Sequence, residues 1–177
     1  MAMKADLIRN IRAAAVSMAA ALVFAPSCTT EINDDRVPGA RVYVPFTTIG
    51  DWNLYGVHAA MDSRRFIPQL REPSGYVWNA VSGAGYGGVL LTADVYGGFL
   101  VFDLACPVER DPQVRVAIAR GESAAKCPKC GSTFDVFSVG GRGPGMGLTG
   151  PAASKNYALR RYNIVFGADG RYALLTN

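Results

Sequence analysis

Histidine is nearly missing from this chain of 177 residues, in which His58 is the only copy. A single histidine excludes a metal site built from two or more imidazoles, and neither a Ser-His-Asp set nor a P-loop pattern accompanies it. We therefore expect His58 to be an ordinary surface or core residue.

Charge is also sparse: charged residues make up 18% of the chain and the net charge is +4. Such a small imbalance gives no reason to predict nucleic acid as a partner.

A hydrophobic run long enough to cross a bilayer is missing as well. The most apolar stretch, residues 13–25, follows the basic residues Lys4, Arg9 and Arg12. It is too short to span roughly 30 Å of hydrocarbon as a helix, but its length and flanks are those of an export signal. We therefore predict that the N-terminus targets the chain to the cell envelope.

The end of this signal, Phe24 to Cys28, resembles a bacterial lipobox, in which the cysteine is lipidated and becomes the first residue of the mature chain. The resemblance implies that residues 1–28 are a lipoprotein signal peptide and that the membrane is a partner through a lipid on Cys28. Phe24 and Pro26 depart from the usual residues of the motif, so the alternatives are a plain signal peptide cleaved nearby or a buried Cys28. Residues 29–39 are largely polar and are expected to be a linker.

Apolar residues, at 50%, and glycine, at 20 copies, are what the chain contains in quantity. This composition suits a turn-rich β protein with a substantial core. Alternating or short apolar segments end at turn residues, and no long amphipathic helix is indicated. The strands expected from these patterns are residues 41–46, 88–93, 99–103, 114–119, 159–166 and 171–175. We therefore predict an all-β, antiparallel domain over residues 40–177, with an irregular section at 50–87.

Three cysteines remain after Cys28, and they lie in two short motifs. Residues 106–109 read Cys-Pro-Val-Glu, and residues 127–135 read Cys-Pro-Lys-Cys-Gly-Ser-Thr-Phe-Asp. The two motifs resemble the boxes of the Rieske family, C-x-H and C-x-x-H, and the resemblance is strongest over residues 86–166. It implies a Rieske-like antiparallel β sandwich or barrel in which two cysteine-bearing loops hold a [2Fe–2S] cluster.

The ligand set of that family is incomplete in this chain. Cys106 and Cys127 occupy the two cysteine positions, whereas Val108 and Cys130 stand where the family has histidines. Because His58 is far upstream, a centre with two histidines and two cysteines cannot be assembled from this chain. The resemblance therefore implies metal positions at Cys106, Cys127 and Cys130, with the [2Fe–2S] cofactor absent or altered.

Three uses of these thiols stay open. Two of them could form a disulfide that pins the loops, as the oxidising compartment of an exported protein favours. All three could hold Zn²⁺ or a non-standard iron–sulfur cluster, with Glu109 or Asp111 supplying an oxygen ligand. Finally, Cys127 and Cys130 form a C-x-x-C pair that could exchange with other disulfides, although such chemistry needs a thiol of lowered pKa.

These features favour a lipid-anchored protein of the bacterial envelope whose Rieske-like domain is a non-redox binding or structural scaffold. Its partner would be an unidentified protein or another envelope component. The alternative is a metal-binding electron-transfer protein that carries zinc or an unusual iron–sulfur cluster. Enzymatic activity is not expected, because Rieske enzymes need a second iron and histidine-rich ligation, which the sequence does not supply.

Overall fold

The computed structural model describes residues 32–167 and 173–177. Cys28 and the rest of the expected signal peptide lie outside the described residues. The described chain is built mainly from antiparallel strands, so the predicted all-β class is confirmed. In this part of the chain, no helix has both the length and the apolar character that crossing a bilayer requires.

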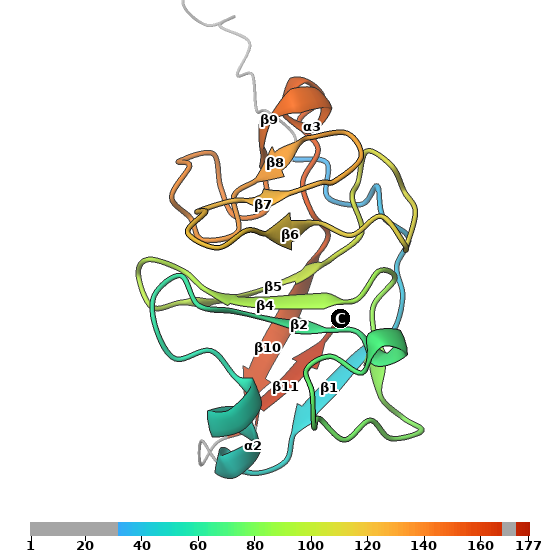
Figure 1. The fold of residues 1–177 in the computed structure, drawn as a ribbon, viewed down its shortest axis with the longest axis vertical. Helices are drawn as coiled ribbons and strands as arrows, with labels where there is room; N and C mark the ends of the chain where they lie inside the picture. Colours follow the sequence, from blue (N-terminus) through green and yellow to red (C-terminus); the bar gives the residue numbers. More distant parts are fainter. Residues whose placement is uncertain (1–31, 168–172) are drawn as a thin grey trace, which may run out of the picture. The chain divides into compact units, whose positions relative to one another are not determined.

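Seven strands form one sheet, which we call the large sheet, in the order β2-β4-β5-β10-β11-β1-β3 (Figure 1). Every neighbouring pair is antiparallel, and the sheet is barrel-like and nearly closed. Its strands are β1 (Val42–Phe46), β2 (Ser63–Phe66), β3 (Gly83–Ala84), β4 (Val89–Ala93), β5 (Phe99–Asp103), β10 (Arg161–Phe166) and β11 (Ala173–Thr176).

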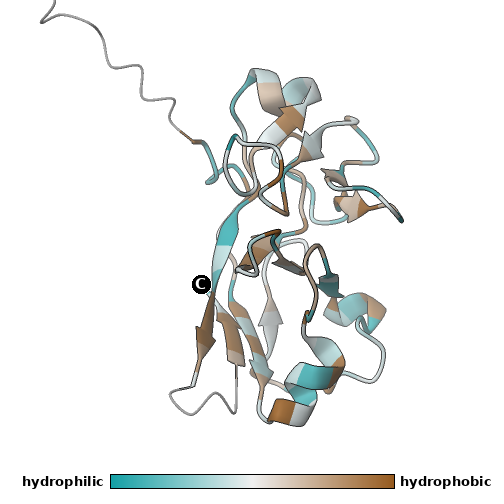
Figure 2. Cartoon of the chain, turned by 90° about the vertical axis from the view of Figure 1, so that its left-hand side faces the viewer, coloured by the Kyte–Doolittle hydropathy of each residue, from teal (hydrophilic) through white to brown (hydrophobic). Residues whose placement is uncertain are grey.

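Four much shorter strands form a second sheet, which we call the small sheet, in the order β6-β7-β8-β9. They are β6 (Ala117–Ile118), β7 (Ala125–Lys126), β8 (Thr133–Phe134) and β9 (Gly147–Thr149). The short helix α3 (Gly150–Ser154) directly follows β9, while α2 (Ile49–Tyr55) and the 3₁₀ turn η2 (Pro68–Leu70) belong to the connections of the large sheet. Figure 2 shows apolar segments along strands of both sheets.

The β4–β5 hairpin separates two hydrophobic clusters, and both of its faces are buried. Leu90 and Phe102 face a cluster shared with the small sheet, whereas Leu91 and Val101 face a cluster inside the large sheet. A strand covered on both sides gains by being apolar on both faces, which explains why Val89, Leu90 and Leu91 follow one another in β4. The Thr92 hydroxyl donates to the carbonyl of Val136 at 2.8 Å and ties this hairpin to the second cysteine motif.

The folded domain begins before residue 40, inside the segment expected to be a linker. Val37 is fully buried, and its carbonyl accepts a hydrogen bond from Nε of Arg160 at 2.7 Å. The carbonyl of Asn33 accepts from the amide of Ala158 at 2.9 Å. These contacts hold residues 33–37 against the segment that leads into β10.

Two expected elements differ in extent. The strand expected over residues 114–119 is reduced to β6, preceded by an isolated bridge between Arg115 and Ala105, because the backbone there turns to support the first cysteine loop. The section over 50–87, expected to be irregular, contains most of α2 and the regular strand β2.

Candidate metal centre

The fold gathers the three cysteines of the two motifs at one place. Their sulfur atoms all lie within 4.8 Å of one another. Sγ of Cys106 lies 3.7 Å from Sγ of Cys130. Cys106 and Cys127 are fully buried, while Cys130 is partly exposed. The sequence prediction that these three residues form one site is therefore consistent with the structure, and three such thiols could hold a metal ion. We call them the cysteine cluster.

The first cysteine loop is held by the carboxylate of Asp103, the last residue of β5. This fully buried group accepts four hydrogen bonds, from the amides of Tyr86 (2.7 Å), Gly87 (3.0 Å) and Ala105 (2.7 Å) and from the hydroxyl of Tyr162 (2.8 Å). Burial raises the pKa of Asp103, and the four donors oppose that rise. The chain therefore leaves β5 in a fixed direction, three residues before Cys106.

A glycine is required beside this loop. A Cβ atom on Gly87 would lie 2.6 Å from the amide nitrogen of Ala105, a distance that real side chains do not tolerate. The loop then continues through hydrogen bonds from the Cys106 amide to the Val114 carbonyl (3.1 Å) and from the Arg110 amide to the Cys106 carbonyl (2.9 Å). Both ends of the loop are thus fixed by backbone contacts.

The second cysteine loop is the tight turn between β7 and β8. The Cys127 amide donates to the Ser132 carbonyl at 2.9 Å, and the Gly131 amide donates to the Cys127 carbonyl at 3.2 Å. Gly131 has a φ of 72°, a conformation that favours glycine and lets the chain reverse immediately after Cys130. The turn places both of its cysteines on the side of the first loop.

Ser132 connects the cysteine cluster to helix α3. Its buried hydroxyl oxygen accepts a hydrogen bond from the Ala152 amide at 3.1 Å and lies 3.2 Å from Sγ of Cys130. Since the Ala152 amide supplies one donor, the hydroxyl proton is free to point at the sulfur when Cys130 is a thiolate. Sequence reasoning noted Gly131-Ser132 as part of a motif but gave Ser132 no role.

The thiols differ in how readily they ionise. Burial raises the pKa of Cys106 well above its ordinary value. Burial also acts to raise the pKa of Cys130, but hydrogen bonds with Ser132 and contacts with the thiols of Cys127 and Cys106 outweigh it and lower that pKa. Cys130 therefore ionises more readily than Cys106, and it is also the one of the two that solvent reaches.

The oxygen ligands suggested by the sequence do not join the cysteine cluster. Glu109 pairs instead with Lys129, whose Nζ lies 2.7 Å from a carboxylate oxygen, and the Asp111 carboxylate accepts from the Gln113 amide at 2.8 Å. Among the described residues, the group of close ligand atoms contains only the three sulfurs. Sequence reasoning missed the Glu109–Lys129 pair, which links the two cysteine loops.

The structure also places Val108 and His58 and shows whether the cysteines are paired. Val108, at the first histidine position of the family, is partly buried and packs against the hydrophobic cluster that contains Cys106. His58 lies outside the site: its Nε2 is 3.1 Å from the carbonyl of Asn53, and its ring packs on Trp52. All three cysteines are free thiols, so the disulfide expected as one alternative is not formed in this structure.

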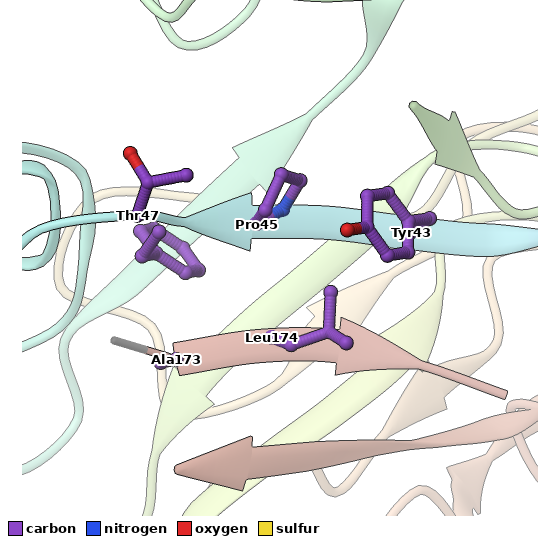
Figure 3. Close-up of a pocket in the computed structure, with 6 residues that line it drawn as sticks. Tyr43, Pro45, Thr47, Ala173 and Leu174 are labelled. Carbon is purple, nitrogen blue, oxygen red and sulfur yellow. The ribbon is translucent and has the colours of Figure 1, made fainter. Parts of the chain in front are cut away.

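A pocket of about 240 Å³ lies on the large sheet, along β1 and β11 (Figure 3). Its lining residues are Tyr43, Pro45, Phe46, Thr47, Ala173 and Leu174. None of the three cysteines lines it, and it brings together no carboxylate, imidazole or thiol. The cysteine cluster is therefore the stronger candidate for a functional site.

No family model, no curated protein and no solved structure matches this chain. The resemblance to the Rieske family is carried by the two cysteine motifs of the sequence, and it stays a prediction.

Proposed function

We propose that this chain is a non-redox scaffold protein of the bacterial envelope, in which Cys106, Cys127 and Cys130 bind a single zinc ion within a Rieske-like β domain. The observation that carries the proposal is the 3.7 Å separation of the Cys106 and Cys130 sulfurs. Two thiolates bound to zinc at about 2.3 Å with a tetrahedral angle lie about 3.8 Å apart. The sulfurs of Cys106 and Cys130 thus lie near the spacing that one zinc ion imposes, and the sulfur of Cys127 lies within 4.8 Å of both.

A two-iron cluster is the second candidate, and the geometry favours it less. Such a cluster spreads its ligands over two metal ions and normally uses four of them. Here three sulfurs are confined within 4.8 Å, and no carboxylate or imidazole of the described residues joins them. This compact, three-sulfur arrangement supports one ion, with its fourth coordination position left to a ligand such as water.

The small sheet gives such an ion a structural role. Three of its four strands, β6, β7 and β8, are only two residues long, and β7 and β8 flank the turn that carries Cys127 and Cys130. Strands this short contribute few ladder hydrogen bonds, so a bond between the two loops through a metal ion would add stability that the sheet lacks.

The test is a metal titration of the reduced protein. We expect one zinc ion per chain, measured by competition with a chromogenic chelator, and a sulfur-to-metal charge-transfer band when cobalt replaces zinc. Binding should strengthen as the pH rises and should release protons, since the thiols must ionise and burial raises the pKa of Cys106.

The Cys127→Ser variant should bind zinc more weakly than the parent by more than about 100-fold, because the change removes a direct ligand rather than a surrounding group. The matched control is Cys28→Ser, which removes a cysteine outside the cluster and should leave affinity unchanged. No zinc binding by the reduced parent, or a brown protein with two irons and inorganic sulfide per chain, would refute the single-zinc site.

We also propose that a lipid on Cys28 tethers the domain to an envelope membrane, where a protein or another envelope component is its partner. The support is the lipobox-like sequence at the end of the apolar segment. Cys28→Ala should move the protein from the membrane fraction to the soluble fraction of cells. Unchanged sedimentation with membranes would contradict the anchor.

A further inference from the structure

Cys106 and Cys130 are placed for a second chemistry besides metal binding. A disulfide bond is about 2.0 Å long, so sulfurs that start 3.7 Å apart need to move by only about 0.8 Å each. The two residues come from different loops, and the ion pair between Glu109 and Lys129 also links these loops. The two sulfurs therefore start close enough for a bond between the loops.

The exposure of each thiol to solvent determines which cysteine an oxidant reaches first. Cys106 and Cys127 are fully buried, whereas Cys130 is partly exposed in its turn. A dissolved oxidant thus meets Cys130 first. Sγ of Cys106 lies 3.7 Å from Sγ of Cys130, within reach of a mixed disulfide formed on Cys130.

We propose that a small-molecule disulfide joins Cys106 to Cys130 and thereby expels the metal ion, so that the cysteine cluster is a redox-controlled site of metal release. This inference rests on the proposed metal site. Metal binding needs three free thiolates and the disulfide consumes two of the same sulfurs, so the two states exclude each other.

The exchange is balanced by one equivalent of oxidant. The thiolate of Cys130 attacks one sulfur of the small disulfide, forming a mixed disulfide and releasing one small thiolate. The sulfur of Cys106 then attacks Sγ of Cys130, which closes the protein disulfide and releases the second small thiolate. The protein loses two electrons and the oxidant gains them; because both protein sulfurs react as thiolates, the two released small thiolates take their protons from water. Cys127 is left as a lone thiolate, which cannot retain the ion by itself.

The experiment treats the zinc-loaded protein with excess oxidised glutathione and follows two readouts. The first is zinc release to a chromogenic chelator. The second is the identity of the bridge after thiol blocking and tryptic digestion. Cleavage after Lys126 and Lys129 separates Cys127 from Cys130, so each pairing gives a different peptide. We expect one bridge per chain, between Cys106 and Cys130, one zinc released per bridge, and full recovery of binding after treatment with a dithiol.

Two variants separate this inference from the proposed function. Cys127→Ser and Cys130→Ser should both weaken zinc binding, but only Cys127→Ser should still form the Cys106–Cys130 bridge. A bridge between Cys127 and Cys130, or zinc retained after the bridge has formed, would overturn the redox control while leaving the zinc site intact. Failure of the reduced parent to bind zinc would instead refute the proposed function.

Discussion

The large sheet and the small sheet are stabilised by different means. The large sheet has strands of up to six residues, and its β4–β5 hairpin is paired over five residues. It also contains aromatic rings in edge-to-face contact, which we call the aromatic cluster. Its main members are Phe46, Trp52, Phe66, Tyr76 and Trp78. This region resembles an ordinary hydrophobic core and needs no additional cross-link.

The small sheet has strands of two or three residues and depends on polar contacts at particular points. The buried carboxylate of Asp103 fixes the start of the first cysteine loop. The buried carboxylate of Asp135 accepts from the amides of Val139 (3.0 Å) and Gly140 (2.7 Å) just after the second loop. The comparison indicates that buried acids and tight turns can hold a group of close thiols in place where strand pairing is short.

The largest effect is expected from the aromatic cluster. Phe46 is fully buried and contacts the rings of Trp52, Phe66 and Tyr76. Phe46→Ala should lower the free energy of unfolding by about 3–5 kcal/mol, measured by denaturant titration, because it removes a ring and leaves a cavity. The control Tyr96→Ala changes a side chain that is 84% exposed and should cost less than about 0.5 kcal/mol. Equal losses in the two variants would mean that this cluster is not the main core.

Zinc binding should stabilise the small sheet and the cysteine loops almost exclusively. At a free concentration of about 100 times its dissociation constant, one bound ion raises the free energy of unfolding by about 2.7 kcal/mol. Hydrogen exchange with and without zinc should show new protection in residues 104–135 and little change in β1 and β11. Protection spread evenly over both sheets would mean that zinc does not stabilise the small sheet selectively.

A smaller loss is expected from Asp103→Asn. The amide keeps one acceptor oxygen but turns an NH₂ group toward donors, while the Tyr162 hydroxyl can reverse and accept from it. We expect a cost of about 2 kcal/mol, with exchange fastest in the first cysteine loop. Tyr162→Phe removes one of the four hydrogen bonds and is the milder comparison, at about 1 kcal/mol. An Asp103→Asn protein as stable as the parent would mean that the loop does not depend on this carboxylate.

Most strands of the large sheet could be predicted, because they are alternating or short apolar segments that end at turn residues. The expected strands at 41–46, 88–93 and 99–103 overlap β1, β4 and β5 closely. The sequence analysis missed helix α2, although Thr48 and Asp51 form a reciprocal capping box at its start. The third helical position, N3, holds Asp51 instead of the more common Glu or Gln, which makes the motif harder to recognise. The brevity of β6 could not be read from its alternating residues, because the neighbouring cysteine loop determines where pairing stops.

The candidate site was predictable in composition and not in geometry. The spacing of the motifs identified Cys106, Cys127 and Cys130, and the structure brings them within 4.8 Å. Sequence alone left Glu109 available as a ligand. Its pairing with Lys129 is set by how two separate loops approach each other, and no local pattern encodes that approach.

The smallest effect is expected from this ion pair, which lies at the solvent edge of the cysteine cluster. The carboxylate of Glu109 raises the pKa of Lys129, so the pair contributes below the ordinary lysine pKa of 10.5 and is lost as the pH rises through the higher folded-state value. Because the Lys129 side chain is 64% exposed, water and salt screen the attraction. One zinc ion with three thiolates carries a net charge of −1, which the Lys129 ammonium stabilises. Lys129→Gln should therefore weaken zinc binding by less than about tenfold at low salt, and the difference from the parent should vanish near 1 M salt.

The matched change Lys155→Gln removes an equal charge elsewhere and should leave zinc affinity unchanged. A salt-independent loss in Lys129→Gln would mean that Lys129 shapes the turn instead of neutralising the bound ion.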